Sequence, residues 1–66
     1  MSPRELGATI RRLRRKARLT QVQLAEQAKI SQPYLSQLEA GRARRLSLQM
    51  AQRLAKALGV KIEDLL

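Results

Sequence analysis

Apolar residues recur along this chain at spacings of three and four, which is the period of helices that pack on one core. The first apolar face consists of Leu6, Ile10, Leu13 and Ala17. Ser2 and Glu5 form an S-x-x-E capping box, and Pro3 occupies the first helical position, where its missing N–H is not needed. The pattern predicts an amphipathic helix that runs from residue 3 to about residue 17.

Two shorter helices are predicted between Thr20 and Gly41. Thr20 and Gln23 form a T-x-x-Q capping box for the first of them. Ser31 caps the second, whose first turn contains Pro33, and Gly41 ends it. Two short helices joined by a turn of a few residues are typical of a helix-turn-helix unit. Their apolar faces consist of Val22, Leu24, Ala25 and Ala28 in the first helix and Leu35 and Leu38 in the second.

The remaining segment predicts two further helices. Ser47 caps a helix over residues 48–58, and Gly59 stops it. Its apolar stripe consists of Leu48, Ala51, Leu54, Ala55 and Leu58. Residues 62–66 can add a last helical turn or two that closes the core. Because no segment alternates with the period of two that strands show, the predicted fold is all-α, in one domain over residues 1–66.

The composition excludes most enzymatic and metal-dependent functions. A chain of 66 residues buries only about 60% of its unfolded surface and leaves no room for a substrate cavity beside its core. Without cysteine it has no thiolate metal site, and without histidine it lacks the commonest general base and metal ligand. We therefore expect no enzyme, no cofactor and no small-molecule substrate.

The charge balance predicts a polyanionic partner. The chain carries 14 basic and 5 acidic residues, a formal net charge of +9, which favours nucleic acid over an anionic membrane surface. A single aromatic residue, Tyr34, argues against single-stranded nucleic acid and RNA, which are bound by stacking on several aromatic rings. No apolar run approaches about 18 residues, and the N-terminal residues form no secretion signal, so a cytoplasmic protein is expected.

Four segments with matching gaps resemble the DNA-binding domain of lambda-type phage repressors and Cro proteins, the xenobiotic-response-element-like (XRE) family. These segments are Gly7 to Arg14, Leu19 to Ala25, Ser31 to Arg42 and Leu54 to Leu66. The resemblance implies a compact five-helix, lambda-repressor-like domain with its helix-turn-helix at helices 2–3, about residues 20–41. It also implies sequence-specific binding of double-stranded DNA by a transcription regulator, more often a repressor than an activator, and often a homodimer.

The chain departs from this family in the turn of the helix-turn-helix. The family often has glycine where this sequence has Lys29. A left-handed backbone at that position costs a non-glycine residue roughly 1 kcal/mol. The sequence predicts either a strained turn or a turn of another geometry.

The third helix is predicted to read the bases. In a helix-turn-helix, the N-terminal residues of the second helix of the unit reach base edges in the major groove. Gln32 and Gln37 are the main candidates, because glutamine can pair bidentately with adenine. Pro33 offers apolar contact to a thymine methyl group, and Ser36 flanks this face.

Residues on either side of the third helix are predicted to contact phosphates. Gln21 begins the second helix, whose free N–H groups and positive dipole end can hold a phosphate. Thr20 is first a helix cap and second a phosphate contact. Tyr34 can donate its hydroxyl, and Arg42 and Arg44 lie in a basic loop that follows the recognition helix.

The family resemblance assigns a structural role to Arg14, which pairs with Glu39 and packs the first helix on the third. The other cations of the first helix are expected to form a general electrostatic field, with one or two of them touching phosphate. The sequence does not say which. These cations are Arg11, Arg12, Arg15, Lys16 and Arg18.

Two alternative functions remain at this stage. A protein-interaction or antitoxin-type module could use the same fold. The basic first helix is also compatible with a peptide that lies on a membrane surface, although several capped helices argue against it. Leu66 is expected to be exposed in a monomer and is a candidate contact in a homodimer.

Overall fold

The structure is a computed structural model that describes residues 2–43 and 46–66. Its elements are α1 (Pro3–Lys16), α2 (Gln21–Ala28), α3 (Gln32–Glu39), α4 (Leu48–Leu58) and the 3₁₀ turn η1 (Ile62–Asp64). The described residues form only helices and turns, as the apolar periodicity predicts. None of the helices within these residues has both the length and the apolar character needed to cross a membrane.

The structure corrects the expected number of helices. In place of a fifth helix it has only a 3₁₀ turn of three residues. Its bonds join Asp64 N to Lys61 O and Leu65 N to Ile62 O, at 2.9 and 3.0 Å. So short a segment gains too few i→i+4 bonds to offset the cost of starting an α-helix. The turn still buries Leu65 completely in the core.

Side-chain caps fix the start of each α-helix. In α1 and α2 the capping boxes form in full. The hydroxyl oxygens of Ser2 and Thr20 each accept from the backbone amide three residues later, and their own backbone amides donate to the side chain of that residue. Ser31 and Ser47 accept in the same way from backbone amides in α3 and α4. The helix starts therefore agree with the sequence prediction.

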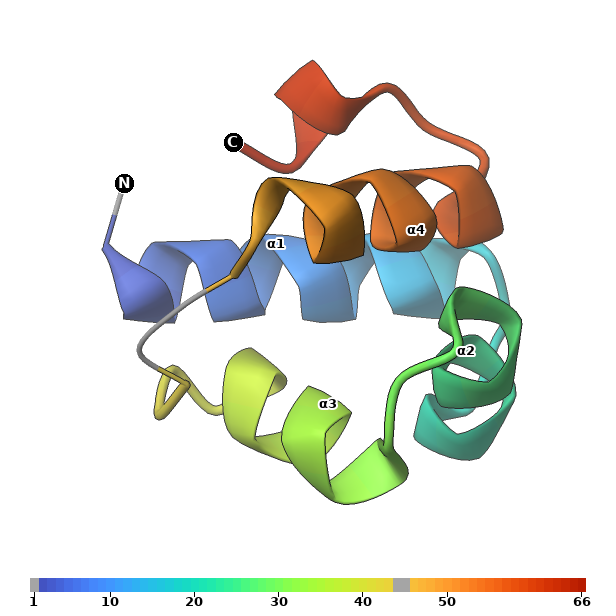
Figure 1. The fold of residues 1–66 in the computed structure, drawn as a ribbon, viewed down its shortest axis with the longest axis horizontal. Coiled ribbons are helices and arrows are strands. Elements are labelled where there is room, and N and C mark those ends of the chain that lie inside the picture. The colour runs from blue at the N-terminus through green and yellow to red at the C-terminus, as the bar shows by residue number, and fades with distance from the viewer. Residues whose placement is uncertain (1, 44–45) are drawn as a thin grey trace.

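The four helices surround one core. Figure 1 shows α1 running along the molecule, with α3 beneath it and α4 with the C-terminal turn above. α2 packs against both α3 and α4. The large side chains that are fully buried are Ile10, Leu24, Leu35, Leu38, Leu54 and Leu65.

Three residues predicted to lie on apolar faces are exposed instead. Val22 is 54% exposed and Leu48 is 66% exposed. At 100° per residue, Val22 lies about 115° from the centre of the buried face of α2. Leu48 lies about 70° from the centre of the buried face of α4, at its edge. Ala17, predicted at the end of the first apolar face, is also exposed because the helix has already ended at Lys16.

A glycine lets α1 pack directly on the end of α3. A Cβ added at Gly7 would lie 2.4 Å from the carbonyl oxygen of Leu38 and 2.6 Å from that of Glu39. Glycine normally destabilises a helix interior by roughly 0.5–1 kcal/mol, so its place here is explained by this contact. The contact brings the surface of α1 next to the helix-turn-helix.

The turn of the helix-turn-helix keeps a left-handed residue although it lacks glycine. Lys29 has φ 58° and ψ 44° and ends α2. Its N–H donates to Glu26 O, and the next amide, that of Ile30, donates to Ala25 O at 3.0 Å. Of the two geometries that the sequence left open, the structure has the strained one. Arg18, after α1, has the same conformation, with φ 59°.

Candidate nucleic-acid interface

The face of α3 opposite the core is open to solvent. Gln32, Pro33 and Gln37 are exposed on it, and Ser36 lies half-buried beside them. All four were predicted to contact bases. The other face of the helix is anchored by Leu35, Leu38 and Glu39, which are buried.

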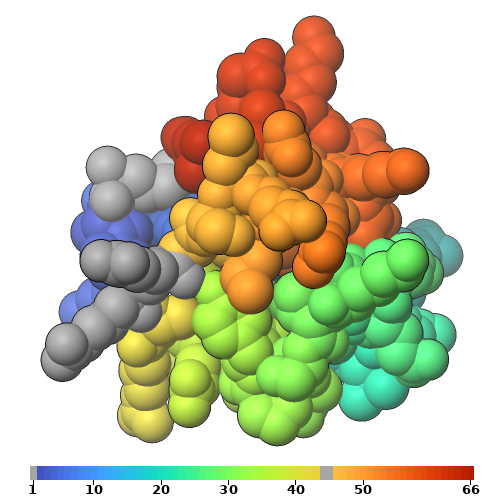
Figure 2. Space-filling model, in the orientation of Figure 1, coloured from blue at the N-terminus to red at the C-terminus, as the bar shows by residue number. Residues whose placement is uncertain are grey.

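One edge of the molecule combines α3 with the segments on either side of it. In Figure 2, α3 and the loop that follows it lie along the lower edge, together with residues of α2. Arg42 is exposed in that loop, directly after Gly41, whose φ of +76° ends the helix. Tyr34 is half-buried and packs against the core. Arg44, also predicted to contact phosphate, lies outside the described residues.

The ion pair implied by the family resemblance is present and holds α1 to α3. Arg14 donates from Nε and Nη2 to the two carboxylate oxygens of Glu39, at 2.7 and 3.0 Å. Its Nη1 donates to the carbonyl oxygen of Leu19 at 2.9 Å. The two side chains are 12% and 4% exposed. The hydrogen bond to Glu39 raises the pKa of Arg14 above its ordinary value.

A chain of hydrogen bonds links this buried pair to the recognition helix. The side-chain amide of Gln21 donates to Glu39 Oε1 at 3.2 Å, and its oxygen accepts from Gln32 Nε2 at 2.9 Å. The sequence prediction missed this positioning role of Gln21 and assigned the side chain to phosphate. The only signal was that both glutamines occupy the first position of their helices.

Thr20 caps α2 and keeps a hydrogen-bond donor available. Its hydroxyl oxygen accepts from the backbone amide of Gln23 at 3.0 Å, and its own amide donates to Gln23 Oε1 at 2.9 Å. Within the part of the chain that the structure describes, the hydroxyl hydrogen has no acceptor. The side chain can therefore cap α2 and donate to an anion at the same time.

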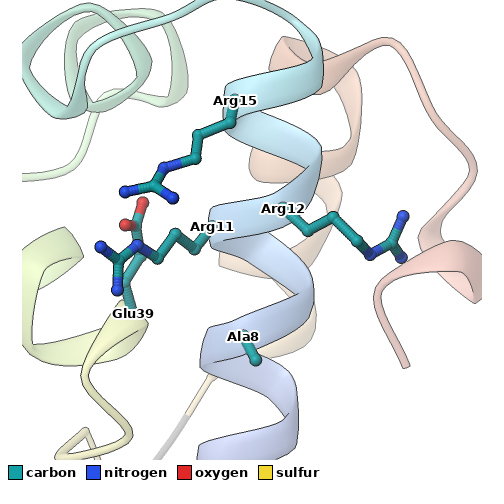
Figure 3. Close-up of a pocket in the computed structure, with 5 residues that line it drawn as sticks. All are labelled: Ala8, Arg11, Arg12, Arg15 and Glu39. Atoms are coloured by element: carbon teal, nitrogen blue, oxygen red, sulfur yellow. The ribbon is translucent and has the colours of Figure 1, made fainter.

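Two adjoining hollows lie beside α1 where it packs against the helix-turn-helix. The narrower, of about 230 Å³, is lined by Arg11, Arg14, Gln21, Ser36, Glu39 and Ala40. The wider, of about 470 Å³, is lined by Ala8, Arg11, Arg12, Arg15 and Glu39. Figure 3 shows Arg11 and Arg15 extending toward Glu39 and Arg12 extending away from it. The structure thus distinguishes cations of α1 that the sequence treats as equivalent.

The comparisons with known proteins agree with this architecture. A sequence model described as a helix-turn-helix domain matches residues 5–66. The crystal structure of the restriction-modification controller protein C.AhdI from Aeromonas hydrophila is similar, with 30% identity and a TM-score of 0.91. The match covers 97% of this chain and 96% of that one. No curated protein sequence matches significantly.

Two crystal structures of the clp gene regulator ClgR from Corynebacterium glutamicum are also similar. Both are 35% identical to this chain and cover 96% of it, with TM-scores of 0.87 and 0.89. The match covers 80% of the ClgR chain in one structure and 66% in the other.

Proposed function

This chain belongs to the helix-turn-helix domain family, and from that premise we propose that it recognises one site in double-stranded DNA through α3 and represses transcription there. The observation that carries the proposal is the recognition face: exposed polar side chains on a short helix whose other side is locked into the core. Such a helix fits the major groove, and its N-terminal residues meet the base edges.

We propose that Gln32 and Gln37 read adenines, with Pro33 against a thymine methyl group and Ser36 at the margin. Gln32 is supported by its bond to Gln21, which fixes the amide before DNA arrives. A side chain that is already ordered loses less conformational freedom on binding.

Phosphate contacts are proposed on both sides of α3. On one side are the backbone amides at the start of α2, near Gln21, and the free hydroxyl hydrogen of Thr20. On the other side are Tyr34, Arg42 and Arg44. Contacts to both strands would fix the register of the helix in the groove.

Regulation is supported by the similar structures, one a restriction-modification controller protein and the other a gene regulator. We favour repression because occupancy of a promoter is sufficient for it. Activation requires, in addition, a favourable contact with the transcription machinery.

We further propose that two copies act together as a homodimer. Symmetric dimers of this motif read half-sites about 10 bp apart. Leu48 and Leu66, which are 66% and 61% exposed, offer apolar area for such an association. Sedimentation of the protein with and without its site would measure the stoichiometry.

Selection of bound sequences from a random pool of DNA duplexes tests the proposal. We expect one enriched motif that contains adenine at the positions read by glutamine, arranged as an inverted repeat if two copies bind. If no motif is enriched and the protein instead retains an acidic protein partner, the interaction-module function replaces this one.

A further inference from the structure

Two arginines of α1 project beside the helix-turn-helix without a partner of their own. Arg11 and Arg15 are exposed and lie one helical turn apart. In the described part of the chain, neither forms an ion pair or a hydrogen bond. The carboxylate that they face, Glu39, already has both oxygens bonded to Arg14. Three guanidinium groups against one carboxylate leave a local surplus of two positive charges.

These two charges adjoin the proposed interface. Arg11 lines the wide hollow on α1 and also the narrow one, where it shares a wall with Gln21 and Ser36. The basic surface of α1 is therefore continuous with the start of α2 and the flank of α3. Arg15 extends the same surface by one turn (Figure 3).

The widths of a helix and of the major groove indicate which part of the DNA the basic surface of α1 would face. A helix with its side chains is about 10–12 Å across, and the major groove is about 12 Å wide. The phosphates of both strands must therefore lie against the elements that flank α3. α1 flanks it closely, since it touches the backbone of α3 at Gly7.

We infer that Arg11 and Arg15 form a clamp on the phosphate backbone of the DNA strand that passes the start of α2. The inference rests on the proposed function and extends its interface from the helix-turn-helix to α1. Guanidinium groups bind phosphate oxygens in a bidentate fork, and the open hollow of about 470 Å³ has room for a phosphodiester group.

The same helix provides a matched control. Arg12 and Lys16 have the same spacing as Arg11 and Arg15, and both are exposed. Arg12 also lines the wide hollow, but its side chain extends away from Glu39 in Figure 3. Lys16 lines a different hollow, with Leu58 and Val60. The double variants R11Q/R15Q and R12Q/K16Q therefore remove equal charge from two faces of α1 that lie about 100° apart.

The experiment measures the affinity of both variants and of the wild type for the selected duplex and for a scrambled duplex of equal length, as salt is varied. We expect R11Q/R15Q to lose about fivefold per contact, so about 25-fold in all, near 0.15 M salt. The slope of log K against log salt should become shallower by about 1.8. Losses should be equal on both duplexes, because phosphates carry no sequence information.

The control R12Q/K16Q should lose less than about threefold and keep the wild-type slope. Equal effects of the two variants, or an unchanged slope for R11Q/R15Q, would overturn the clamp. Absence of wild-type binding to any duplex would instead reject the proposed function, so the two failures are distinguishable. Circular dichroism melting would verify that both variants are folded.

Neutral methylphosphonates placed one at a time along the duplex would locate the contact. At one or two neighbouring positions, the wild type and R12Q/K16Q should both lose affinity, whereas R11Q/R15Q should lose nothing further. If every sensitive position of the wild type remains equally sensitive in R11Q/R15Q, the clamp is excluded.

Discussion

A single side chain in the helix-turn-helix, that of Gln21, forms hydrogen bonds with two other side chains. The amide of Gln21 donates to Glu39 and accepts from Gln32, so one residue connects a buried charge to a base-reading candidate. Its sequence position predicted a helix start but not this link, because the link depends on how α2 and α3 cross. In contrast, the exposure of Gln32 and Gln37 follows from the helical wheel around Leu35 and Leu38.

Gln37→Ala tests base reading at this scale. Loss of a bidentate contact to adenine, worth about 1–3 kcal/mol, should weaken binding to the selected site by about 5- to 150-fold. Binding to scrambled DNA should change little. Fluorescence anisotropy with both duplexes measures this difference, and equal losses would remove Gln37 from base reading.

Breaking the Arg14–Glu39 ion pair should lower the free energy of unfolding. Arg14→Met leaves the carboxylate of Glu39 buried with only the Gln21 amide as a partner, which should cost about 3–5 kcal/mol. Arg14→Met combined with Glu39→Met should recover much of that loss, since two apolar side chains can replace a buried pair. Urea unfolding of the wild type, the single variant and the double variant measures the coupling. If the single variant is as stable as the wild type, the pair does not hold α1 to α3.

At the scale of the elements, capping residues in the sequence predict where the helices begin, but the sequence does not predict the geometry of the turns between them. The capping residues Ser2, Thr20, Ser31 and Ser47 predict every α-helix start, because a cap is a contact within four residues. The sequence left the geometry of the turn at Lys29 open, and over residues 62–64 it did not distinguish an α-helical turn from a 3₁₀ turn. The fit of α1 on α3 at Gly7 is likewise invisible without the fold, since a glycine in a helical pattern indicates only weaker helix propensity.

Lys29→Gly should stabilise the turn between α2 and α3. Glycine adopts the left-handed conformation without the cost of roughly 1 kcal/mol that lysine bears. Part of this gain is offset by the larger conformational entropy of glycine in the unfolded chain. We therefore expect the free energy of unfolding to rise by less than about 1 kcal/mol, measured by urea unfolding. A decrease would indicate that the lysine side chain contributes a stabilising interaction with the end of α2.

Gly7→Ala should separate α1 from α3. The new Cβ would overlap the carbonyl oxygens of Leu38 and Glu39, and backbone cannot move aside as a flexible side chain can. Overpacking of this kind costs about 1–3 kcal/mol. Gly59→Ala is the control, because its Cβ would meet nothing within 4 Å and would cost only left-handed strain. Thermal melting should place Gly7→Ala below Gly59→Ala, and the reverse order would contradict the close contact.

At the scale of the whole molecule, the net charge of +9 predicts a polyanion but not where it lies. Sequence periodicity divides the cations of α1 from its core face, yet it cannot show which of them adjoin α3. The structure makes that division, because α1 packs on α3 through one side and leaves Arg12 directed away from it. The proposed interface thus involves three helices. The sequence assigns contact residues to two of them and expects one or two cations of the first helix to touch phosphate without identifying which.

Salt dependence measures this arrangement as a whole. Four arginines per chain are assigned to phosphates: Arg11, Arg15, Arg42 and Arg44. Each phosphate neutralised contributes about −0.9 to the slope of log K against log salt. One bound chain should therefore give a slope of about −3.6, and a homodimer about −7. Titrations over about 50 to 200 mM salt, combined with the sedimentation stoichiometry, distinguish these values. A flat response in either state would show that the positive charge does not contact DNA, whatever the bases contribute.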